Sequence, residues 1–126
     1  MGTANRRDNS RIPLQIFLNQ YVKDDPHRCM SYNLSPKGIY LGGLVRAVER
    51  PTPIMGLEFE LPGTSEVIGA RGEVRFDMRD AYLQGTGVEF TGMACAHKRL
   101  VRDYVLDQKV RRLRSLLKSI RYNRMQ

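Results

Sequence analysis

Two short polar motifs near the start of the chain carry residue types that can recognise a purine nucleotide. The first, RRDNSR at residues 6–11, holds three arginines, and the second, NLSPKG at residues 33–38, holds an amide, a hydroxyl and a glycine. A planar guanidinium donates two parallel hydrogen bonds to O6 and N7 of guanine, and the same geometry fits a phosphate. Its flat face can also stack on a base. The two motifs therefore predict a site for an anionic guanine nucleotide.

The candidate ligand-binding residues are the charged residues of the first motif and the turn residues of the second: Arg6, Arg7, Asp8, Arg11, Asn33, Ser35 and Gly38. Asp8 is suited to orienting the guanidinium groups or to accepting a hydrogen bond from a guanine amino group. Asn33 and Ser35 can hydrogen-bond base edges or stabilise their own turn, and Gly38 allows a positive φ or the close approach of a ligand. Taken separately, an arginine-rich N-terminus is also typical of a solvated tail, and NxSxxG of an ordinary turn.

The order and spacing of the motifs are more specific than either motif alone. With 16 arginines in 126 residues, RRxxxR is a weak signal, whereas NxSxxG is rarer. As RRxxxR followed one strand later by NxSxxG, the pair resembles the PilZ family, whose characterised members are mostly bacterial receptors for cyclic di-GMP. The resemblance implies a mainly β fold, a six-stranded antiparallel barrel with a long C-terminal helix. It also implies cyclic di-GMP as a ligand, with no cofactor.

The resemblance further implies roles for individual residues. It assigns the arginines of the first motif to guanine and phosphate contacts, and Asn33, Ser35 and Gly38 to the opposing wall of the site. In the family, an arginine at the position of Arg6 tends to accompany an intercalated pair of ligand molecules, so we expect two per protomer. The implied mechanism is a disorder-to-order switch, in which the ligand draws residues 1–11 onto the barrel.

Length and composition are those of a single folded domain. A chain of 126 residues can bury its own core, and contents of 41% hydrophobic and 27% charged residues exclude general disorder. No apolar run is long enough to cross a bilayer, and the first residues lack the apolar stretch of a secretory signal, so we expect a cytoplasmic protein. Cys29 and Cys95 are too few for a disulfide framework, and we expect both to be small buried residues.

The positive charge is confined to the end of the chain. Residues 1–96 contain 11 Lys or Arg and 11 Asp or Glu, whereas residues 97–126 contain 10 against 2. The motif arginines therefore lie in a part of the chain with no net charge. We divide the chain into a flexible ligand-binding segment at 1–11, a barrel at 12–96 and a basic amphipathic helix at 97–126.

Alternation of apolar and polar residues predicts strands over residues 12–22, 28–34, 38–44, 54–61, 68–76 and 82–90. In the fifth strand the alternation places Phe76 on the same face as Ile68 and Val74. The KDDPH segment predicts a turn whose backbone is preset by Pro26. Short strands without helices between them indicate an antiparallel barrel or sandwich, and closure would remove exposed edges.

Residues 95–122 contain no Gly or Pro and have the periodicity of a helix. Its apolar residues alternate in steps of four and three, as in a heptad seam: Leu106, Val110, Leu113, Leu117 and Ile120. An earlier subset is expected to pack onto one end of the barrel: Leu100, Val101, Tyr104 and Val105. The exposed seam predicts self-association or a protein partner.

These features favour a cyclic di-GMP receptor that changes conformation and passes the signal to a partner in motility, biofilm formation or a similar bacterial output. A cyclic di-GMP-responsive DNA-binding regulator is the alternative, because the basic helix would attract nucleic acid or an anionic membrane. An enzyme is least favoured, since His27 and His97 lie in no metal-binding or catalytic motif and we expect surface or turn positions for both. Four glutamates belong to outward strand positions: Glu58, Glu60, Glu73 and Glu89. Gly85 and Gly87 are expected to be strand-bend glycines.

Overall fold

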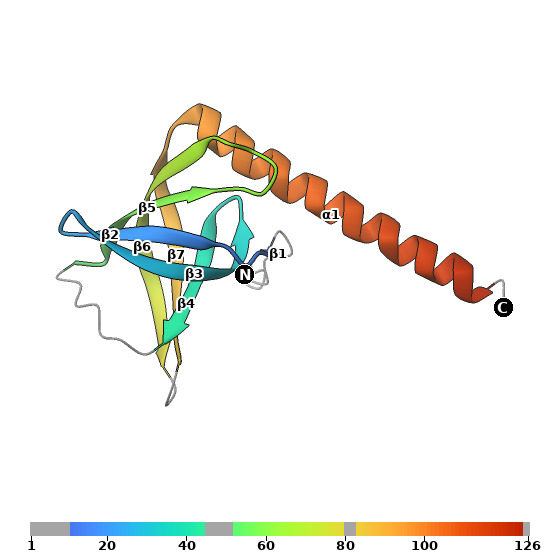
Figure 1. The fold of residues 1–126 in the computed structure, drawn as a ribbon, viewed down its shortest axis with the longest axis horizontal. Coiled ribbons are helices and arrows are strands. Elements are labelled where there is room, and N and C mark those ends of the chain that lie inside the picture. Colours follow the sequence, from blue (N-terminus) through green and yellow to red (C-terminus); the bar gives the residue numbers. More distant parts are fainter. Residues whose placement is uncertain (1–10, 45–51, 80–82, 125–126) are drawn as a thin grey trace, which may run out of the picture.

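A computed structural model describes residues 11–44, 52–79 and 83–124 of the chain. The elements are β1 (Ile12–Pro13), β2 (Phe17–Val22), β3 (Asp25–Ser35), β4 (Gly38–Leu44), β5 (Ile54–Glu60), β6 (Val67–Arg79), β7 (Leu83–Met93) and α1 (Cys95–Arg124) (Figure 1). Within these ranges, six antiparallel strands close in the order β3-β2-β5-β6-β7-β4, and β1 pairs with β3 outside the ring. The predicted six-stranded barrel with a C-terminal helix is confirmed.

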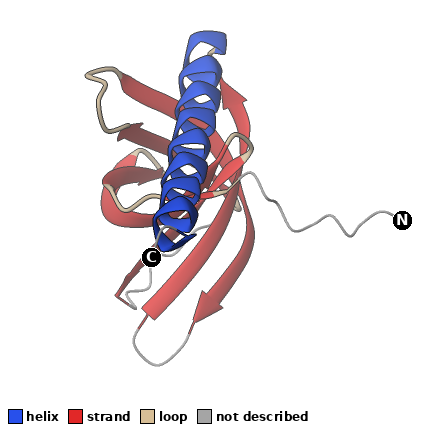
Figure 2. Cartoon of the chain, turned by 90° about the vertical axis from the view of Figure 1, so that its right-hand side faces the viewer, coloured by secondary structure: helices blue, strands red, loops and turns tan. Residues whose placement is uncertain are grey.

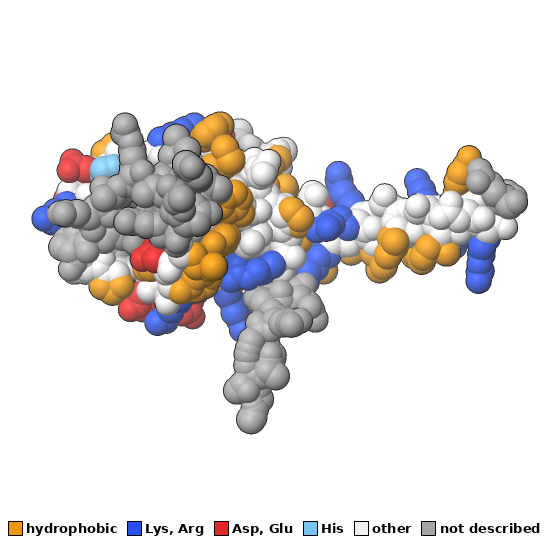
Figure 3. All heavy atoms as spheres, turned by 90° about the horizontal axis from the view of Figure 1, so that it is seen from below, with side chains coloured by type: hydrophobic (Ala, Val, Ile, Leu, Met, Phe, Trp, Pro, Cys, Tyr) orange, Lys and Arg blue, Asp and Glu red, His pale blue; other side chains and the backbone are white. Residues whose placement is uncertain are grey.

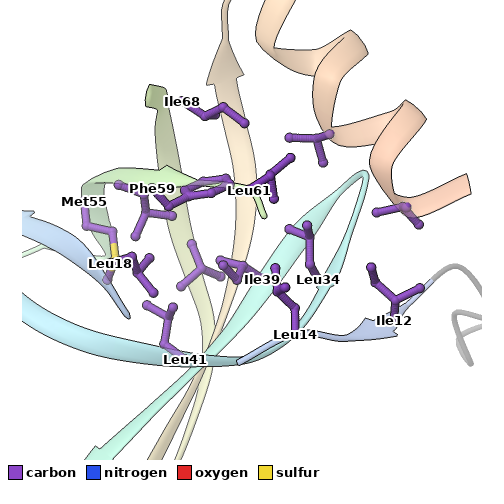
Figure 4. Packing of buried hydrophobic residues seen from close by; sticks show 14 residues of the cluster. Ile12, Leu14, Leu18, Leu34, Ile39, Leu41, Met55, Phe59, Leu61 and Ile68 are labelled. Atoms are coloured by element: carbon purple, nitrogen blue, oxygen red, sulfur yellow. The ribbon is translucent and has the colours of Figure 1, made fainter. Parts of the chain in front are cut away.

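The inward residues of the strands form the core. In β5 the alternation predicted from the sequence is observed, with Met55, Leu57 and Phe59 at most 3% exposed. Ile12 and Leu34 lie on the side of the core that α1 covers (Figure 4). Closure of the barrel buries one face of every strand in the ring, which is why a period of two is so clear in this sequence.

The single strand predicted over residues 12–22 is wrong, because residues 14–16 separate β1 from β2. The cause is Ser31, which is fully buried and donates its hydroxyl to the carbonyl of Leu14 at 2.5 Å. The same oxygen accepts from the backbone N–H of Ile16 at 3.2 Å. This side chain therefore satisfies backbone groups that a continuous strand would have paired.

The turn predicted at KDDPH is shorter than expected. Lys23 and Asp24 alone form it, with φ of 54° and 65°, and β3 begins at Asp25. Two consecutive residues with positive φ are typical of the tight hairpin that matches strand twist. Pro26 lies within β3 opposite Tyr21, and β3 pairs with β4 only from Met30 onward. The fixed φ of Pro26 therefore does not shape the turn.

Irregular pairing in two strands turns aromatic side chains outward. In β3 the register with β4 shifts between Ser31 and Asn33, so Tyr32 is an extra residue. In β6 the register with β7 shifts between Val74 and Phe76. The prediction that Phe76 shares the inner face with Val74 is therefore wrong, and Phe76 is 47% exposed. Each bulge moves the following residues to the other face.

The helix packs against the barrel only through its first turns. Val101 and Val105 are buried, and α1 contacts β1 and β3. Burial raises the pKa of the Tyr104 phenol, and the charge of Arg111 opposes this shift. Beyond these turns α1 projects away from the barrel (Figure 1), and Figure 2 views the molecule from the side on which the helix projects. The described helix contains no stretch long and apolar enough to span a membrane.

The cysteines differ from the sequence-based expectation, whereas both histidines are partly exposed. Cys95 is exposed at the first position of α1 and Cys29 is half-buried, so the expectation of two buried cysteines is wrong. His27 lies within β3 and not in a turn. His97 connects the start of α1 to β6, because its Nδ1 accepts from the backbone N–H of Gly69 at 3.3 Å and its Nε2 lies 3.4 Å from Glu66.

Candidate functional site

The described part of the two motifs comes together where β1 meets the hairpin of β3 and β4. Arg11 immediately precedes β1, Asn33 and Ser35 end β3, and Gly38 begins β4. The pairs Ile12 with Leu34 and Pro13 with Asn33 set this arrangement. Arg6, Arg7 and Asp8 lie outside the described residues.

Arg11 and Asn33 join the two motifs directly. The Nη1 of Arg11 donates a hydrogen bond of 2.6 Å to the Oδ1 of Asn33, at an exposed position. This bond orients the guanidinium across the turn at the end of β3. Because a guanidinium has five N–H donors in a planar fork, one bond to an amide leaves donors for a nucleotide base or phosphate.

Ser35 stabilises the turn rather than presenting its hydroxyl to solvent. Its side chain is fully buried. The Oγ accepts from the backbone N–H of Lys37 at 3.2 Å and from that of Gly38 at 3.1 Å. The hydroxyl also lies 3.4 Å from the carbonyl oxygen of Gly38, to which it can donate. Of the two roles considered for Ser35, the geometry shows the turn-stabilising one.

Gly38 is required by the neighbouring strand. Its φ is not positive, so of the two uses considered for Gly38 the left-handed backbone is not the one observed. A Cβ on Gly38 would lie 2.3 Å from the carbonyl oxygen of Val88 and 3.3 Å from the Cα of Glu89. The missing side chain therefore allows β4 to approach the backbone of β7 at the start of the hairpin.

A row of aromatic side chains continues from Asn33 across the outer face of the barrel. Asn33 pairs with Tyr40, Tyr40 with Gly87, and Gly87 with Phe76. The ring centroids of Tyr40 and Phe76 are 5.7 Å apart, and their planes are inclined by 28°. The ring centroid of Tyr32 lies 5.6 Å from that of Tyr40. Together Tyr32, Tyr40 and Phe76 form what we call the aromatic row.

Glycines make room for the aromatic row. A Cβ on Gly85 would lie 2.0 Å from the Tyr40 hydroxyl oxygen, and one on Gly87 would lie 2.2 Å from the Phe76 ring. The expectation that these glycines bend the strand is therefore incomplete, because both lie directly under aromatic side chains. Their lack of a side chain lets the rings lie flat against the sheet.

The acidic charge next to the hairpin is compensated. Glu89 pairs with Gly38 in the register of β4 and β7, and it forms an ion pair with Arg75. Arg75 also lies 3.3 Å from Glu73. The negative potential that Glu89 would otherwise place beside an anionic ligand is thus reduced.

Tyr40 is the residue that reasoning from the sequence missed. It lies on the same outer face as Asn33 and next to it in the pairing of β3 with β4. Alternation in GIYLG could have indicated this position, because Ile39 and Leu41 are core residues and Tyr40 must then point outward. Among the described residues no group of three or more His, Cys, Asp or Glu side chains is arranged to hold a metal ion.

Comparison with solved structures identifies the fold. The inhibitor of motility MotI/DgrA of Bacillus subtilis superposes with a TM-score of 0.71 at 17% identity, over 80% of this chain and 50% of that chain. The PlzA protein of Borreliella burgdorferi, solved in complex with c-di-GMP, gives a TM-score of 0.57 at 16% identity, over 80% of this chain and 41% of that chain. No family model and no curated protein matches the sequence.

Both of these proteins contain PilZ domains, and the barrel and helix described above have the same arrangement. The chain therefore has the PilZ-type fold. It spans at most half the length of the two proteins.

Proposed function

We propose that the protein is a receptor for cyclic di-GMP, which binds where the two motifs meet on the outer surface of the barrel. The observation that carries the proposal is the hydrogen bond between Arg11 and Asn33, which joins RRxxxR to NxSxxG in space. Similarity in fold to a protein solved with c-di-GMP supports it. The site described above offers an arginine fork, an amide and an aromatic ring, and these groups suit a guanine base and its phosphate.

In this proposal each group has a separate task. Arg6, Arg7 and Arg11 bind guanine edges and phosphates, with Asp8 orienting them, and Asn33 forms the opposing wall. Ser35 and Gly38 act through the shape of the turn, and the Tyr40 ring packs beside a base. An arginine at position 6 supports two ligand molecules per protomer.

The proposed ligand site is connected to the helix through β1. Arg11 is followed by Ile12, which is 1% exposed, and β1 packs against α1. A ligand that reorients Arg11 would therefore act on the residue that contacts the base of the helix. We propose that the protein, acting in the cytoplasm, passes the signal through α1 to a protein partner or a second copy, in motility, biofilm formation or a related output, without catalysis.

Isothermal titration of the full chain with cyclic di-GMP, beside GTP and cyclic AMP, tests the proposal. We expect binding of cyclic di-GMP with two molecules per protomer. Arg7→Ala and Arg11→Ala should each weaken binding by about tenfold to a hundredfold if each makes a bidentate contact. Arg28→Ala is the matched control, because Arg28 is exposed in the other half of β3 and stacks on Phe17. No binding of cyclic di-GMP would refute the proposal, and a ratio of one would refute the paired ligand.

The alternative function is a DNA-binding regulator that responds to cyclic di-GMP. The observation that favours it is the exposed basic surface of α1, which includes Arg111, Arg112 and Arg114. Retention on double-stranded DNA should then fall steeply with salt and change when cyclic di-GMP is added. If the chain is not retained on DNA at low salt, the alternative is refuted and protein binding is the role proposed for the helix.

A further inference from the structure

The projecting part of α1 carries an apolar seam that the barrel does not cover. Its residues are 37–60% exposed: Leu106, Val110, Leu113, Leu117 and Ile120. Figure 3 shows hydrophobic side chains gathered along one edge of the projecting helix. Leu116 beside the seam is 57% exposed. Such a continuous apolar row on a solvated helix is typical of a surface that pairs with another helix.

The seam faces away from the barrel. Successive residues of a helix turn by about 100°, which places the seam roughly a third of a turn from the line of Val101 and Val105. These two valines are buried against the barrel. A second helix can therefore lie along the seam without displacing any contact of α1 with its own barrel.

Charge is distributed unevenly along the helix. The two acidic residues of the segment 97–126, Asp103 and Asp107, lie near the barrel, whereas the free end of the helix carries Arg121 and Arg124. The side chain of Asp107 is 55% exposed although it contacts Arg111 at 3.0 Å. The acidic part of one helix therefore complements the far end of another only when the two run in opposite directions.

We propose that α1 pairs antiparallel with α1 of a second copy of this chain. In the register that aligns the seams, Leu113 packs against Leu117 of the second copy, and Leu116 meets its own equivalent across the axis. Asp107 then lies beside Arg121 of the second copy, twice in each dimer. The same register places Arg114 beside its own equivalent, one like-charge pair in each dimer. A parallel pair would instead place Lys109 beside Arg114 of the second copy on each side of the seam, two like-charge pairs, and would lose the pairs of Asp107 with Arg121.

The barrel assists this pairing. A coiled coil of fewer than three heptads is marginal on its own, largely because the first helical turn is costly to form. Here Val101 and Val105 anchor the first turns of α1 to the barrel, so the seam is presented on a helix that is already nucleated. The pairing does not depend on cyclic di-GMP and is testable without it.

Sedimentation equilibrium of the full chain, from about 1 µM to about 1 mM, tests the proposal. We expect a monomer–dimer equilibrium that Leu113→Glu weakens by about a hundredfold, because a charge would enter the seam. The matched control is Ser115→Glu, which adds the same charge at an exposed position on the opposite side of the helix. It should leave dimerisation within about threefold of the wild type.

A charge exchange determines the direction of pairing. Asp107→Arg and Arg121→Asp should each weaken the dimer by about tenfold, and the double variant should restore it. Circular dichroism monitors the helix content of each variant. A wild-type chain that stays monomeric at about 1 mM overturns the proposal and leaves an unrelated partner as the occupant of the seam. A double variant as weak as the single variants overturns the antiparallel direction.

Discussion

Replacement of Gly38 by alanine tests whether this residue serves the neighbouring strand or the ligand. In the structure the new Cβ would lie 2.3 Å from the carbonyl oxygen of Val88, which is about 1 Å inside ordinary contact. The other atom is backbone, so β4 and β7 must separate. Forcing an extra methyl into a packed site costs about 1–3 kcal/mol, and each ladder bond lost adds about 1 kcal/mol.

We therefore expect Gly38→Ala to lower the free energy of unfolding by about 2 kcal/mol in urea denaturation. The affinity for cyclic di-GMP should fall as well, because the N–H of Gly38 holds the hydroxyl of Ser35 in the turn. Gly69→Ala is the matched control, since Gly69 lies in β6, has no positive φ and has nothing within 4 Å of its added Cβ. It should be neutral or stabilising by about 0.5 kcal/mol.

If Gly38→Ala leaves the free energy of unfolding unchanged but abolishes nucleotide binding, the reasoning is refuted. Gly38 would then make room for the ligand itself and not for β7. If Gly69→Ala destabilises the protein as much as Gly38→Ala, the contact with Val88 does not explain the loss.

Two further predictions concern one residue inside the barrel, Ser31, and one on its outer surface, Tyr40. Ser31→Ala should destabilise the protein by about 1–3 kcal/mol, since it leaves the buried carbonyl of Leu14 without its hydroxyl partner. Chemical denaturation measures this loss, and an effect equal to that of the exposed control Ser119→Ala would contradict it. Tyr40→Ala should weaken cyclic di-GMP binding by about tenfold through loss of ring contact. In calorimetry, an equal loss in the exposed aromatic control Phe17→Ala would show that Tyr40 has no special role.

The motif residues show how far sequence reasoning can reach. Residue types and order predicted that Arg11 and Asn33 lie close together, and the Nη1 of Arg11 lies 2.6 Å from the Oδ1 of Asn33. The same reasoning could not decide between two roles for Ser35, or identify the strand that Gly38 approaches. The answer for Gly38 depends on atoms of β7, about 50 residues away in the chain. The answer for Ser35 depends on the backbone geometry of the turn itself, where its hydroxyl bonds to Lys37 and Gly38.

The sequence by itself determined the barrel strands, the long helix and the positions of the two motifs. Alternation and helical periodicity are local properties, because they depend on which side chains within a few residues of one another face the core. Only the tertiary structure decided the break after β1, the bulges at Tyr32 and Arg75 and the outward position of Phe76. Each of these depends on pairing between distant strands, where one extra residue exchanges the inner and outer faces.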